Sequence, residues 1–148
     1  RRVMQDQVFR VEYFAITADD RPGTGADLGR RLKDEGVNLL ALSAFPLTAG
    51  RTQVDLIPEH PEQFMRAAKK MNLTLGEPKI AFLIQGTDRP GAMGEVLIRL
   101  GAANISVRAT LGVAGGSNRY GGILWVNQQD IELASRALGA TTMAAHHV

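Results

Sequence analysis

The sequence predicts an α+β fold in which one β-α-β-β-α-β unit occurs twice. The tetrapeptide Asp-Arg-Pro-Gly is found at residues 20–23 and again at residues 88–91. Each copy follows a strand-like run and opens a helical pattern. Each helix then leads to an Asn that begins another strand-like run. The same order of elements around the same loop indicates a duplicated domain, and this loop is the place where we expect function.

The first unit covers residues 8–76. A strand is expected over 8–17, where aromatic and β-branched residues alternate with charged ones. Thr24 and Asp27 resemble a capping box, which predicts a helix that ends near Gly36. The other elements expected in this unit are strands over 38–45 and 52–57, a helix from Pro61, and a short last strand over 73–75.

The second unit covers residues 79–145 and repeats this order. Its helix after the loop has an apolar face, and its next helix is expected to be capped by Asp130. The three strands expected before that second helix cover residues 80–84, 105–111 and 120–126. A last strand is expected after Gly139, although this segment has little β character.

The two units differ in the spacing between the loop and the Asn that follows the helix. Pro22 and Asn38 are 16 positions apart, whereas Pro90 and Asn104 are only 14 positions apart. This difference predicts that the helix of the second unit is about half a turn shorter.

Units with this order of elements are ferredoxin-like, each an antiparallel sheet with both helices on one face. The bare face and the free edges of each sheet need cover from the sister unit or from another chain. We therefore expect a homodimer.

Composition limits the classes of function. The chain of 148 residues has no Cys, which excludes disulfides and thiolate chemistry, and its formal charge of +2 gives no case for nucleic acid or an anionic membrane. No apolar run approaches the length of a membrane span, so we expect a cytoplasmic protein without a membrane partner.

The loop and the Asn after the helix suit a zwitterionic α-amino acid. The start of a helix offers backbone N–H groups to a carboxylate, and glycine in the loop lets a ligand approach the backbone closely. Asp20 and Asp88 are suited to accept hydrogen bonds from an ammonium group, and the Asn amides can donate and accept. The same residues also fit structural roles as helix cap, turn and loop end, and both interpretations stay open.

This doubled arrangement resembles the ACT domain, over nearly the whole chain. The resemblance implies a regulatory module that senses an amino acid at the loop and at the interface between paired modules, with no cofactor and no catalysis of its own. The residues that it implies as ligand-binding, together with their loop neighbours, are Asp20, Arg21, Pro22, Gly23, Asn38 and Leu39 in the first unit and Asp88, Arg89, Pro90, Gly91, Asn104 and Ile105 in the second.

Other functions are less well supported. Residues 119–126 loosely echo the basic-Gly-aromatic strand of the RNA-recognition motif, but the corresponding strand of the first unit, 52–57, has no aromatic residue. No nucleophile–base pair, metal-ligand spacing or phosphate loop is visible, which disfavours an enzyme. A pure dimerisation module is a further alternative. The favoured interpretation is an amino-acid sensor that regulates an enzyme on another chain.

Overall fold

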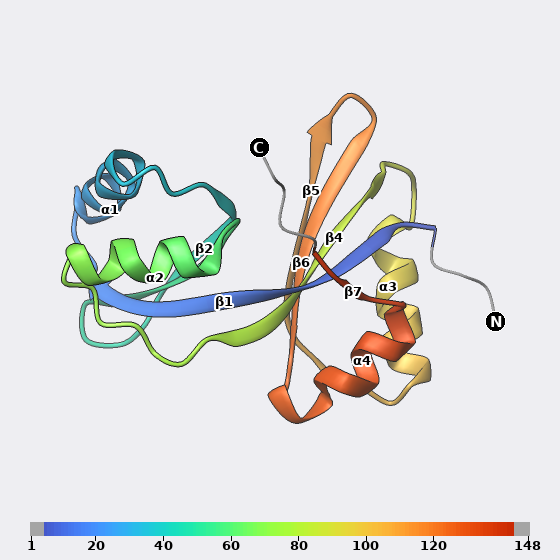
Figure 1. The fold of residues 1–148 in the computed structure, drawn as a ribbon. Coiled ribbons are helices and arrows are strands. Elements are labelled where there is room, and N and C mark those ends of the chain that lie inside the picture. The colour runs from blue at the N-terminus through green and yellow to red at the C-terminus, as the bar shows by residue number, and fades with distance from the viewer. Residues whose placement is uncertain (1–4, 144–148) are drawn as a thin grey trace. The chain divides into compact units, whose positions relative to one another are not determined.

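The computed structural model describes residues 5–143, which form two compact units. One unit contains residues 12–79, and the other contains residues 5–11 and 80–143. The first strand, β1 (Gln7–Asp19), contributes residues to both units (Figure 1). Within the described range the fold is α+β, with four α-helices, mainly antiparallel strand pairs and one short parallel pair. The predicted fold class is confirmed at this level.

The unit formed by residues 12–79 contains a three-stranded antiparallel sheet in the order β2-β3-β1. The register pairs Ile16 and Ala44 with the same residue of the central strand, Val54. Phe14 and Phe64 lie in the core of this unit, with ring centroids 5.0 Å apart. The further elements are α1 (Thr24–Asp34), β2 (Leu39–Pro46), β3 (Arg51–Pro58) and α2 (Pro61–Lys70).

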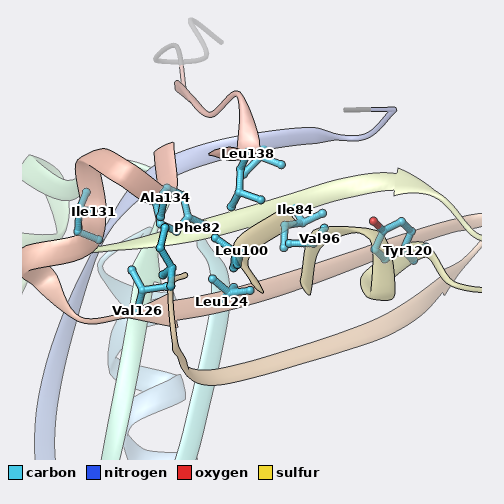
Figure 2. Close-up of a cluster of buried hydrophobic side chains, with 13 residues drawn as sticks. Phe82, Ile84, Val96, Leu100, Tyr120, Leu124, Val126, Ile131, Ala134 and Leu138 are labelled. Atoms are coloured by element: carbon cyan, nitrogen blue, oxygen red, sulfur yellow. The ribbon is translucent and has the colours of Figure 1, made fainter. Parts of the chain in front are cut away.

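The other unit has the strand order β7-β1-β4-β6-β5, in which the short β7 pairs in parallel with β1. Its helices α3 and α4 enclose a single core with the sheet, which Figure 2 shows around Phe82, Leu100 and Leu124. The elements are β4 (Lys79–Thr87), α3 (Ala92–Ala102), β5 (Val107–Gly116), β6 (Arg119–Val126), a 3-10 turn (Gln128–Asp130), α4 (Ile131–Leu138) and β7 (Thr141–Thr142).

The helix after the second loop is not shorter than that after the first, as the spacing had suggested. Both α1 and α3 have 11 residues. The segment between the end of the helix and the following Asn is shorter in the second unit instead. Four positions separate Asp34 from Asn38, but only two separate Ala102 from Asn104.

Two predicted caps also differ in the structure. Thr24 is the first residue of α1, and the cap position belongs to Gly23, with φ 93° and no capping side chain. Asp130 does occupy the cap position of α4, but its side chain makes no capping hydrogen bond. A left-handed glycine therefore sets the start of α1, because only glycine adopts this conformation without strain.

The short last strand expected over 73–75 is absent, since residues 73–78 have no regular structure. Asn72 has φ 55°, which turns the chain after α2. Leu73 and Leu75 still pack against the core of this unit. The alternation of apolar residues is therefore explained by packing, without ladder hydrogen bonds. In the second unit the weak last strand exists as β7, which has only two residues.

No helix in residues 5–143 is long and apolar enough to cross a membrane.

Replacement of Phe64 by alanine should lower the free energy of unfolding by about 3 to 4 kcal/mol, because the ring is fully buried against Phe14 and its loss leaves a cavity. Chemical denaturation monitored by circular dichroism measures this change. The adjacent Met65 is 39% exposed, so Met65→Ala serves as control and should change stability by less than about 0.5 kcal/mol. Equal effects of the two substitutions would contradict the assigned core.

Candidate functional site

The first loop joins the end of β1 to the start of α1. The backbone N–H of Asp20 donates to the carbonyl of Gly50, at 2.8 Å, which ties the loop to the turn between β2 and β3. The second loop is held in the same way, because Asp88 N–H donates to the carbonyl of Asn118 at 2.9 Å. Gly23 and Gly91 both have positive φ and precede a helix. The two loops therefore share one backbone design.

A cavity of about 780 Å³ lies beside the first loop. Its base contains three core side chains, Ile16, Leu28 and Val54. Its rim includes Asp20 and Arg21 from the loop. Among the other residues that line it are Ala18, Asp19, Thr24, Gly25, Asp27, Arg31, Ala44, Arg51, Thr52, Asn72 and Thr74. The cavity thus combines an apolar base with a charged rim.

Most charged side chains of this rim are paired with one another. Arg51 contacts Asp19 at 2.5 Å. Arg31 lies 3.9 Å from Asp27 and also donates a hydrogen bond to the carbonyl of Met71. Asp20 and Arg21 make no side-chain hydrogen bond or ion pair with any residue in the range 5–143. Within the described residues, one carboxylate and one guanidinium group are therefore free at the rim.

The structure does not bring Asn38 and Leu39 to this cavity. Both line an adjoining cavity of about 570 Å³, which includes Lys33 and Gly36 at the other end of α1. The two cavities have Gly25, Leu28, Ala44 and Val54 in common. The carbonyl of Asn38 accepts a hydrogen bond from the N–H of Glu59 at 2.9 Å. The predicted site of the first unit is thus divided between the two ends of α1. Pro22 and Gly23 lie in the loop itself and line neither cavity.

The arginine of the second loop is bound by carboxylates of the chain itself. Both terminal nitrogens of Arg89 donate to Asp6, at 2.9 Å from Nη1 to Oδ1 and at 3.1 Å from Nη2 to Oδ2. Nη2 also donates to Glu95 at 2.9 Å, and Nη1 donates to the carbonyl of Thr87 at 2.9 Å. The hydroxyl of Tyr120 donates to Asp6 at 2.5 Å. We call Asp6, Arg89, Glu95 and Tyr120 the Asp6 network.

Sequence reasoning missed Asp6, which lies 83 positions from Arg89. A signal was nevertheless present at Gly86, which occupies the position of Ala18 in the first unit. A Cβ at Gly86 would lie 2.1 Å from Oδ1 of Asp6, so only glycine leaves room for the buried carboxylate. A glycine inside a strand often marks such a close approach.

The network determines the ionisation of its members. Burial by itself raises the pKa of Asp6, but hydrogen bonds from Arg89 and Tyr120 and the charge of Arg89 together lower it below its ordinary value of 3.8. The pKa of Tyr120 is raised, first by burial and then by its hydrogen bond to Asp6. Asp6 is therefore a buried carboxylate that stays ionised at neutral pH.

The predicted residues of the second unit are divided between its loop and the segment that follows α3. Asp88, Arg89 and Gly91 line a cavity of about 450 Å³, but Pro90, Asn104 and Ile105 do not. Asn104 has φ 59° just after α3, and Ile105 belongs to the core. These last two residues therefore end the helix and fill the interior.

Solved structures with a similar fold include BT0572 from Bacteroides thetaiotaomicron, with a TM-score of 0.74 and 18% identity over 91% of this chain and 89% of that one. The regulatory subunit of aspartate kinase from Thermus thermophilus matches with a TM-score of 0.60 and 14% identity, over 94% and 97% of the two chains. The chain has an ACT-type fold. A regulatory domain of aspartate kinase from Porphyromonas gingivalis, described as putative, matches this ACT-type fold with a TM-score of 0.56 and 14% identity, over 92% and 96%. No protein-family model and no curated protein sequence matches the chain.

The Asp6 network gives a prediction about pH. The side chain of Asp6 is 1% exposed, and Asp6→Asn removes the charge that pairs with Arg89. The free energy of unfolding at pH 7 should therefore fall by about 3 kcal/mol. A carboxylate with a lowered pKa contributes stability that is present above the unfolded-state pKa and is lost as pH falls through the folded-state pKa. The wild-type protein should therefore lose its advantage over Asp6→Asn as pH falls from about 5 to below the lowered pKa of Asp6.

Urea denaturation of both proteins between pH 7 and pH 2.5 measures this difference. Asp88→Asn serves as control, because its side chain is exposed and should matter by less than about 0.5 kcal/mol. A difference between wild type and Asp6→Asn that stays constant across this pH range would contradict the role of the Asp6 charge.

Proposed function

We propose that the chain is a regulatory protein, without catalysis of its own, that binds a free amino acid. In this proposal residues 8–76 and 79–145 are two ferredoxin-like ACT modules in tandem, and the bound amino acid changes how the modules pair in a cytoplasmic homodimer. The regulated enzyme lies on another chain. The likeness to regulatory parts of aspartate kinase supports a regulatory role.

The observation that carries the proposal is the cavity at the first loop with its free charges. Asp20 suits the α-ammonium group of an amino acid, and Arg21 suits the α-carboxylate through paired N–H donors. The hydroxyl of Thr24 is buried at the same place and has no hydrogen-bond partner within the described part of the chain. A zwitterion satisfies an acid, a base and a hydroxyl at once.

The side chain of Tyr120 argues against the RNA-binding alternative. A recognition strand of that kind must expose its aromatic rings so that bases can stack on them. The ring of Tyr120 is buried in the core (Figure 2). Its hydroxyl donates a hydrogen bond to Asp6. The aromatic residue that opens the 119–126 strand is therefore engaged within its own unit.

Thermal unfolding of the purified protein against each of the twenty amino acids and a short RNA pool tests this function. An amino acid that binds only the folded state should stabilise it by about 2.7 kcal/mol at a hundredfold excess over its Kd. Arg21→Ala removes a charge-assisted contact and should weaken binding by about 10-fold to 100-fold. Arg66→Ala removes an exposed arginine of α2, away from the cavity, and should leave the affinity unchanged.

A shift with RNA but with no amino acid would contradict the proposal. Equal loss of affinity in Arg21→Ala and Arg66→Ala would place the ligand elsewhere on the chain.

A further inference from the structure

We infer that the first loop alone binds the ligand and that this ligand is an amino acid with an aliphatic side chain. At the second loop, the chain's own side chains occupy part of the space and bind the loop arginine. The inference rests on the proposed function and gives it a site, a stoichiometry and a substrate class. Three contrasts between the loops carry it.

The first contrast is the state of the loop arginine. Arg89 is bound by Asp6 and Glu95, whereas Arg21 has no partner in the described part of the chain. Three positions into α1, Asp27 stands where α3 has Glu95. Asp27 has a shorter side chain and contacts Arg30 at 3.5 Å and Arg31 at 3.9 Å on its own helix. The first loop therefore keeps its guanidinium group available for a ligand.

The second contrast is the space under the start of the helix. Met93 follows the second loop by two residues, and Gly25 has the same position after the first. A Cβ at Gly112 or at Gly122 would lie 2.8 Å from an atom of Met93, so the Met93 side chain covers this pair of strand glycines. A Cβ at Gly25, in contrast, would meet no atom within 4 Å.

The strand residues that face these two helix positions also differ between the units. The register that pairs Ile84 with Gly122 in the second unit pairs Ile16 with Val54 in the first. In the first unit the strands thus supply an apolar base and the helix leaves space above it. In the second unit Gly112 and Gly122 leave the strands without side chains at this point, and Met93 occupies part of the space. The cavities measure about 780 Å³ and about 450 Å³, respectively.

The third contrast is the residue after the loop glycine. Thr24 places a buried hydroxyl without a partner at the first loop, whereas Ala92 at the second loop has no side-chain polar atom. The polar groups that suit a zwitterion are therefore complete only at the first loop.

The base of the first cavity selects the ligand's side chain. Ile16, Leu28 and Val54 are core residues that offer no polar atom, so a charged side chain placed there would lose its hydration without compensation. An aliphatic side chain would bury apolar surface against the same atoms. Leucine, isoleucine or valine fits this combination of apolar base and charged rim.

Isothermal titration calorimetry with L-leucine, L-isoleucine, L-valine, L-alanine, L-aspartate and L-lysine tests the inference. One of the three branched amino acids should bind with one molecule per chain, and about 30-fold more tightly than alanine because of the extra buried carbons. Gly25→Met copies the partly filled state of the second loop and should weaken this binding at least tenfold. Its melting temperature should not fall, because Met is a better helix former than Gly.

Gly101→Met is the matched control, since Gly101 lies on α3, a Cβ there would meet no atom within 4 Å, and Gly101 does not line the cavity at either loop. Its affinity should equal that of the wild-type protein. Two bound molecules per chain, tightest binding of aspartate or lysine, or undiminished binding by Gly25→Met would each overturn the inference while the proposed function stands. Binding of none of the twenty amino acids would overturn the proposed function itself.

Discussion

The buried carboxylate of Asp6 is the constraint on which the unit of residues 5–11 and 80–143 depends. A buried charge is tolerated only when it is paired and fully hydrogen-bonded, and here Arg89 and Tyr120 satisfy it. This requirement explains why Gly86 has no side chain and why the second loop arginine points inward. It also holds the start of β1 against the residues around the loop. One ionised group thus links the N-terminal strand, the loop and β6.

The two loops share the same backbone conformation but have different surroundings. Both begin with a backbone hydrogen bond to a hairpin turn, and both end at a left-handed glycine that starts a helix. The side chains around the two loops differ in how much space they leave. Met93 and the Asp6 network occupy part of the space at the second loop, whereas Gly25 and the shorter Asp27 leave the first one open. In our proposal one copy became a support and the other kept the ligand.

The free charges of the first loop matter because the rest of its rim is neutralised. Arg51 neutralises the charge of Asp19, and Arg31 neutralises that of Asp27. Asp20 and Arg21 therefore set the electrostatic character of the rim. Opposite charges at the edge of an apolar base are complementary to a small zwitterion with an apolar side chain. The same amino acid would find no free guanidinium group at the second loop. This asymmetry is the basis of our proposal that one ligand binds per chain.

The sequence by itself determined the α+β class, the position of both loops and the order of the elements, apart from the last strand expected over 73–75, because hydrophobic periodicity and the Pro-Gly signals are local. It also identified Asp20 and Arg21, which meet at one cavity. Only the tertiary structure decided that Asn38 and Leu39 line another cavity, that Ile105 belongs to the core, and that Arg89 is bound by Asp6. These outcomes depend on contacts between segments far apart in the chain. A local sequence pattern does not predict which distant side chain contacts a loop. For this reason the sequence alone did not show that the two identical tetrapeptides have different surroundings.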